Sequence, residues 1–130
     1  MKDSVSLLLA IGGFIILFSV IINLLLETGI IIRISAVVSA LLSPLGLTYD
    51  IVVPLVSGLF EITTGVSMTS TAAGLSILQQ LAAASFILGW AGLSVHSQVL
   101  SIISETDISI TPYLAGKFLQ GIFAAVYTVI

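Results

Sequence analysis

The chain has 130 residues, of which 58% are hydrophobic and only 7% are charged, and its formal net charge is −3. A soluble domain carries about 25% charged residues, so this composition excludes a water-soluble surface and predicts an all-α integral membrane protein. One histidine and no cysteine offer no ligand set for a metal, and the few basic residues exclude nucleic acid as a partner; we expect no cofactor.

The first predicted element is an apolar run of 22 residues, 5–26. The core of a signal peptide has about 7–15 residues, and no small-residue cleavage site follows this run. At 1.5 Å per residue the run reaches roughly 33 Å, which is about the thickness of the hydrocarbon core. We therefore predict a transmembrane helix.

The second element, residues 30–43, is interrupted by Arg33 and ends before Pro44. About 14 helix-compatible residues are too few to cross a bilayer comfortably. We predict a helix that lies in the membrane interface, with a tilted membrane segment as the alternative.

The third element, residues 50–80, begins with an apolar piece that ends at Glu61 and a hydroxyl-rich stretch. Ten residues of helix reach only about 15 Å, half of the membrane. We expect regular helix to be lost over residues 61–71 and to resume at about Ala72. Two short apolar pieces that flank a polar tip predict a re-entrant helical hairpin.

The fourth element, residues 81–104, is predicted to be one membrane span that is broken near its centre. Gly89 and Gly92 interrupt its apolar pattern, and polar residues follow at once. Residues 112–130 form the last predicted transmembrane helix. Because no charge-rich linker occurs, residues 1–130 are expected to form a single domain.

Each predicted interruption carries one ionisable residue, Glu61 in the first and His96 in the second. Such groups cost about 2.5–3.5 kcal/mol each inside a bilayer on insertion scales, and non-helical backbone at that depth faces protein or a wet cavity. In one class of transporter, broken helices meet near the midplane and direct their N-termini at the substrate; here helices starting near Ala72 and Ser97 would do so. The predicted substrate-binding residues are Glu61, Thr63, Thr64, Ser67, Thr69, Ser94, His96, Ser97 and Gln98.

Other interpretations of these residues stay open. Glu61 could carry a coupling proton, hold the two interruptions together through His96, or be a paired structural carboxylate. His96 could be a packing residue, and hydroxyls in membrane helices often bond their own backbone. An enzyme is not expected, because Ser94 and His96, two residues apart on a helix, do not face each other. An ion channel is less favoured because no filter pattern occurs.

Three stretches resemble a known family: GLFEITTG (58–65), LAAASFILGWAGLSVHSQV (81–99) and SETDISITPYLAGKFLQGIFAA (104–125). They are similar to the C-terminal half of sporulation integral membrane proteins of the YlbJ type. That family carries the gate, or nucleoside-recognition, domain, which it shares with the spore maturation proteins and distantly with concentrative nucleoside transporters. The resemblance implies transport of a small polar or anionic solute, dipicolinate-like or nucleoside-like, across the cell membrane or the outer forespore membrane. On family grounds Glu61, Thr63, Thr64 and Gly65 correspond to the first gate motif, and Ser94, His96 and Gln98 to the second.

Relatives of this type are longer and carry two gate-like halves, whereas this chain holds one. One repeat of an inverted-repeat transporter does not form both sides of a midplane site. The sequence is therefore either a piece of a longer protein or a lipid-embedded half-transporter subunit, and we predict that it pairs as a homodimer or with a second gate-domain subunit. Lys2 and Arg33 flank opposite ends of the first helix, so charge sets no orientation. The alternative function is a non-transporting assembly protein in spore maturation.

Overall fold

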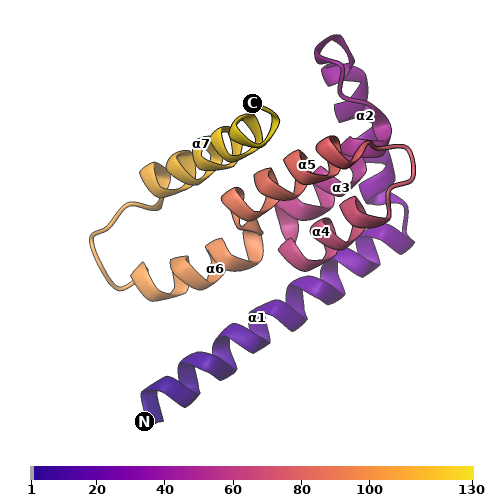
Figure 1. Cartoon of the computed structure of the whole chain (residues 1–130). Helices are drawn as coiled ribbons and strands as arrows, with labels where there is room; N and C mark the ends of the chain where they lie inside the picture. The colour runs from indigo at the N-terminus through magenta and orange to yellow at the C-terminus, as the bar shows by residue number, and fades with distance from the viewer. Residues whose placement is uncertain (1) are drawn as a thin grey trace.

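The computed structural model describes residues 2–130, and within that range every regular element is helical, as Figure 1 shows. The all-α fold class is therefore confirmed. The Lys2 side chain, used above in the argument on orientation, lies outside the described part. In chain order the elements are α1 (Lys2–Glu27), α2 (Ile30–Leu42), the short 3-10 helix η1 (Ser43–Leu45), α3 (Tyr49–Phe60), α4 (Ile62–Thr71), α5 (Ile77–Trp90), α6 (Gly92–Ile103) and α7 (Ile110–Val129).

Two segments of the described chain are long and apolar enough to cross a membrane, Asp3–Glu27 and Ile77–Ile103. The first is the span predicted at residues 5–26. The second combines α5 and α6, which meet at residue 91, and it begins four residues earlier than the broken span predicted from residue 81. α7 has 20 residues but is not among these two segments, so its crossing of the membrane stays a prediction.

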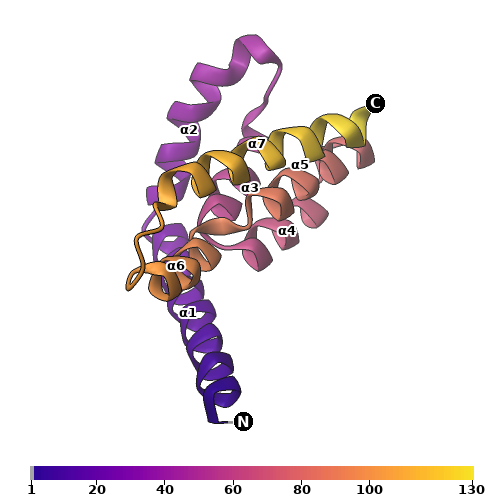
Figure 2. The same ribbon diagram turned by 90° about the vertical axis from the view of Figure 1, so that its left-hand side faces the viewer.

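α1 projects from the body of the molecule as a long rod whose N-terminal half is mostly exposed (Figures 1 and 2). Its other half is anchored, because Ile22 is fully buried in a core shared with Ile31 of α2 and Val52 of α3. α2 has 13 residues, as expected for a helix too short to span, and its depth in the membrane stays a prediction. The exposed apolar surface of α1 suits lipid or a partner helix.

α3 and α4 form an antiparallel helical hairpin with only Glu61 between them. The two backbones approach closely at Gly58 and Gly65, where a Cβ on Gly65 would overlap the Cα of Gly58. At the open end of the hairpin Asp50 lies against Gly74. Re-entry of this hairpin into the membrane stays a prediction.

The predicted loss of helix over residues 61–71 is wrong, because α4 is regular from Ile62 to Thr71. Its hydroxyls bond their own helix, as when Thr69 Oγ1 donates to the Val66 carbonyl at 2.7 Å. The irregular segment follows α4, and the helix expected from Ala72 begins at Ile77. Ser76 caps that helix in a capping box with Gln79, a local signal that identifies the true start.

α5 and α7 pack side by side and antiparallel, as the two views show (Figures 1 and 2). Gly89 and Gly121 allow the close approach, since a Cβ on Gly89 would lie 2.8 Å from the Gly121 Cα. Thr128 Oγ1 donates to Ser85 Oγ at 2.8 Å near the other end of the pair. α7 thereby holds the first half of the broken span in place.

Candidate functional site

Glu61 forms the first chain break and caps the helix that follows it. The residue is only 3% exposed and has extended backbone, with φ −148° and ψ 126°. Its Oε1 accepts the Thr63 backbone N–H at 3.0 Å, and its Oε2 accepts the Thr64 N–H at 2.8 Å and the Thr64 hydroxyl at 3.0 Å. A carboxylate at a helix N-terminus satisfies free N–H groups and interacts favourably with the helix dipole. The buried acid is therefore stabilised by its own hairpin.

The second chain break lies between α5 and α6 and is made by two consecutive left-handed residues, Ala91 (φ 76°) and Gly92 (φ 75°). It sits directly against the first break. A Cβ on Gly92 would lie 3.3 Å from the Phe60 carbonyl oxygen and 3.4 Å from the Ile62 nitrogen. The two interruptions, about thirty residues apart in the sequence, are thus in contact, and glycine is needed at the point where the backbones meet.

A cavity of about 220 Å³ lies beside this contact. Its polar side comes from both breaks and contains four of the predicted binding residues, while α1 supplies an apolar wall. Because α4 and α6 both begin at the breaks, some side chains of their first two turns face the cavity. The lining residues are Glu61, Ile62 and Thr63, Ser94, Val95 and Gln98, and Ile11 and Ile15.

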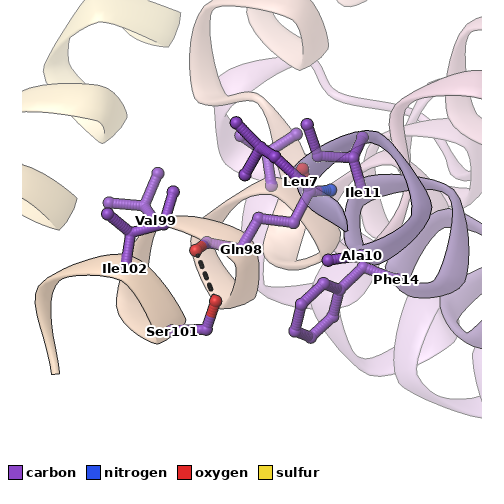
Figure 3. Close-up of a pocket in the computed structure, with 9 residues that line it drawn as sticks. Leu7, Ala10, Ile11, Phe14, Gln98, Val99, Ser101 and Ile102 are labelled. Atoms are coloured by element: carbon purple, nitrogen blue, oxygen red, sulfur yellow. Dashed lines mark hydrogen bonds between the residues drawn. The ribbon is translucent and has the colours of Figure 1, made fainter. Parts of the chain in front are cut away.

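A second cavity of about 150 Å³ continues along the contact between α1 and α6, as Figure 3 shows. It is largely apolar and shares Ile11, Val95 and Gln98 with the polar cavity. Ser101 Oγ donates to the Gln98 backbone carbonyl at 3.0 Å (Figure 3). Because Gln98 lines both cavities, it lies where the polar cavity meets the apolar one. The other lining residues are Leu7, Ala10, Phe14, Val99 and Ile102.

The remaining predicted residues do not line the polar cavity. The Thr64 hydroxyl is committed to Glu61, Gly65 is the close contact of the hairpin, and Thr69 bonds its own helix. Ser67 is exposed and Ser97 is half-buried. The reason is the helical form of α4, which turns successive hydroxyls to different sides.

Within the described residues His96 makes no hydrogen bond to Glu61, so the expectation that it joins the two breaks through that carboxylate is wrong. Among the described residues, the Glu61 carboxylate bonds to Thr63 and Thr64 of its own hairpin and to no others. The His96 ring is 3% exposed and packs edge-on against Trp90, with centroids 4.3 Å apart, and Tyr113, at 5.4 Å. Within the described residues neither ring nitrogen makes a hydrogen bond. Two positions from Ser94 on one helix, His96 points to another side.

Sequence reasoning attached no chemistry to Trp90, which the structure places at the junction of the two breaks. Its indole N–H donates to the Leu59 carbonyl at 3.1 Å, near the end of α3. The apolar wall from Ile11 and Ile15 was also missed. For Trp90 the only local signal was its position between two glycines, and for the apolar wall the sequence holds no local signal. Both features depend on contacts between segments distant in the sequence.

The arrangement offers hydroxyl and amide groups for hydrogen bonding. Ser94 is 2% exposed, and its neighbour on the helix, His96, makes no hydrogen bond to it. Within the described residues no group of three or more metal-ligating side chains occurs. Thr63, Ser94 and Gln98 can therefore orient a polar solute, while Glu61 already accepts three hydrogen bonds.

Comparison with known proteins identifies the family of the chain. Residues 8–109 match the profile of the family described as Gate, nucleoside recognition. The chain belongs to the gate family. Over 128 residues it is 42% identical to the sporulation integral membrane protein YlbJ of Bacillus subtilis (strain 168).

That alignment covers 98% of this chain and 31% of the relative, so the chain spans about a third of the relative's length. No solved structure matches the chain. The resemblance seen in the sequence is therefore confirmed, and this gate-family chain is related to an integral membrane protein of sporulation.

Proposed function

We propose that this chain is a half-transporter subunit that moves a small polar or anionic solute across a membrane. The observation that carries the proposal is the polar cavity at the contact of two broken helices, lined by Glu61, Thr63, Ser94 and Gln98. Broken helices that meet in this way are how many secondary transporters place polar groups at membrane depth. Family resemblance adds the solute class, dipicolinate-like or nucleoside-like.

Recognition in this proposal depends on neutral donors. The Glu61 carboxylate accepts three hydrogen bonds from its own hairpin, so it positions the hairpin tip rather than pairing with a solute cation. The Thr63 and Ser94 hydroxyls and the Gln98 amide then supply directional hydrogen bonds to carboxylate or carbonyl oxygens. Glu61 is a positioning residue in this arrangement, and His96 does not contact the solute.

Pairing is part of the proposal. A cavity of about 220 Å³ is smaller than the roughly 300–1,000 Å³ of most ligand pockets, as expected for one side of a site that a second repeat completes. The large exposed apolar surface of α1 gives a partner a face to cover. The partner is a second copy of this chain or another gate-domain subunit, and mass measurement in nanodiscs distinguishes these from a monomer.

Transport is tested by uptake of labelled dipicolinate and labelled uridine into vesicles that contain the purified chain. Gln98→Leu removes the amide but keeps the bulk of the side chain, and we expect uptake to fall about tenfold, since an unmade hydrogen bond in a binding site costs about 1–3 kcal/mol. Gln120→Leu is the matched control, because Gln120 is an exposed amide on α7. Equal uptake in the parent and in Gln98→Leu would contradict the site.

A second candidate function is that of a non-transporting assembly protein in spore maturation. The local satisfaction of Glu61 and the packing of His96 between aromatic rings favour it. Such a protein would take up neither solute, and its assembly would depend on Glu61 but not on Gln98. Co-purification of membrane partners with Glu61→Ala and Gln98→Leu variants separates this function from transport.

A further inference from the structure

A row of five aromatic rings passes across the second chain break. The rings are packed edge to face, with centroid separations of 5.9 Å for Phe86–Phe118, 6.0 Å for Phe118–Trp90, 4.3 Å for Trp90–His96 and 5.4 Å for His96–Tyr113. They come from α5, α6 and α7. Trp90 precedes the break at Ala91 and His96 follows it, so the closest pair of the row holds the two sides of the break at a fixed angle.

Trp90 also ties the second break to the first. Its indole N–H donates to the Leu59 carbonyl in the last turn of α3, where backbone carbonyls lack partners within their own helix. One side chain therefore contacts both the hairpin that carries Glu61 and the half-helix that carries Ser94 and Gln98. A movement of α6 relative to the hairpin must therefore change or break the contacts of Trp90.

Two features beside Trp90 are unfavourable as they stand. Ala91 has φ 76° and is the one non-glycine residue with positive φ in the described chain, a conformation that a Cβ disfavours. His96 is buried while both ring nitrogens lack partners among the described residues, which leaves their desolvation uncompensated. Such features persist where the surrounding structure enforces them, and they gather at switch regions.

We propose that Trp90 and His96 form a latch that holds α6 bent at Ala91, in the position where Ser94 and Gln98 line the cavity. When the latch opens, α6 shifts and the His96 ring gains access to hydrogen-bond partners that the bent arrangement denies it. The unsatisfied histidine raises the free energy of the closed state, in which α6 is bent, relative to the open state. A solute that binds one of these two states better then changes their populations. The role of the latch in transport rests on the proposed function, whereas its mechanical behaviour does not.

The latch is tested by the reactivity of a single cysteine, because the chain contains none. Gln98→Cys reports movement of α6 through its rate of modification by a polar thiol reagent in nanodiscs. Adding Trp90→Phe removes the indole N–H and keeps a ring; we expect modification to become on the order of fivefold faster, the population change for one net hydrogen bond. Phe118→Leu is the control, since it removes a ring contact to Trp90 but leaves the bond to Leu59, and we expect no more than about a twofold change.

His96→Phe gives an effect of opposite sign. Phenylalanine keeps the edge-on contacts but has no nitrogen to satisfy, so the open state loses its advantage and modification of Gln98→Cys becomes slower. A purely structural role for both residues predicts faster modification in both variants. Faster modification in His96→Phe, or equal rates in Trp90→Phe and Phe118→Leu, would overturn the latch; monodisperse elution and unchanged helical circular dichroism establish folding in each case.

Solute probes form a separate arm of the same experiment. Dipicolinate and uridine are each added to a Val95→Cys protein, whose cysteine lines the same cavity while Gln98 is kept, and protection of that cysteine supports the proposed function. Absence of protection by both probes would count against that function for these solutes, while the latch is decided by the comparison of variants without solute. The sole tryptophan, Trp90, provides an independent signal, because opening alters its emission.

Discussion

The two chain breaks meet in space but are built in opposite ways. At the first, Glu61 leaves helical conformation for one residue, and its carboxylate accepts every hydrogen bond that the start of α4 directs to it. At the second, Ala91 and Gly92 turn the chain through left-handed backbone, α6 begins without a side-chain cap, and the buried His96 has no hydrogen-bond partner among the described residues.

A helix in an apolar protein can therefore be interrupted in two ways: neighbouring side chains bond the freed backbone groups, or they do not. The Glu61 break is compensated within its own hairpin and should resist deformation. The Ala91 break is held by contacts from elsewhere, above all Trp90 and α7, and should be the easier of the two to move. The polar cavity lies between a rigid wall and a movable one.

Gly65→Ala is the largest expected perturbation, because it forces apart the rigid wall. Its Cβ would overlap backbone atoms of Gly58, which cannot move without separating α3 from α4. We expect a loss of about 3 kcal/mol in the free energy of unfolding, measured by circular dichroism during denaturation in mixed micelles. Gly116→Ala is the control; outside its own helix backbone, no atom of the described residues lies within 4 Å of the new Cβ, and helix propensity should increase stability slightly. Similar losses in both variants would contradict the close contact.

Glu61→Ala tests whether the first break depends on its cap. The substitution leaves two backbone N–H groups and the Thr64 hydroxyl without their acceptor, and we expect a loss of about 2 kcal/mol in the free energy of unfolding. Glu105→Ala removes an exposed carboxylate near the end of α6 and should have almost no effect. If Glu61→Ala were as stable as the parent, the carboxylate would not be the structural cap described here.

Ala91→Gly is the smallest of the three effects and has the opposite sign. Glycine adopts positive φ without the steric cost that alanine carries at this position, so we expect a gain of about 1 kcal/mol in stability. Ala84→Gly, in the interior of α5, should instead lose about 1 kcal/mol. Destabilisation by both substitutions would show that the second break is not strained, and the contrast between the two breaks would disappear.

Much of the architecture could be predicted from the sequence. Length and hydropathy predicted the span at residues 5–26, and the glycines near Trp90 predicted a broken second span, found at Ala91. The polar tip at Glu61 marked a hairpin, although the helix resumes at once and not at Ala72. Glu61 lies two and three residues before Thr63 and Thr64, a spacing at which a carboxylate can cap a helix. The cap was missed because the hydroxyl-rich stretch was interpreted as irregular.

The composition of the candidate site could be predicted only in part. Glu61, Thr63, Ser94 and Gln98 do line one cavity, because polar residues beside helix breaks tend to face a common polar space. His96 does not line it, since the phase of α6 follows from its start at Gly92 rather than near Ser97. An error of a few residues in a helix start rotates every later side chain by 100° per residue, which is enough to exchange the two faces.

By itself, the sequence determined that the protein is helical, apolar and broken at two polar places, because hydropathy and chain breaks are local properties. Tertiary structure alone decided that the breaks touch at Gly92, that α1 closes the cavity with Ile11 and Ile15, and that Trp90 joins the hairpin to α6. These features depend on close packing between segments distant in sequence, and packing selects one arrangement from many that the same local pattern allows.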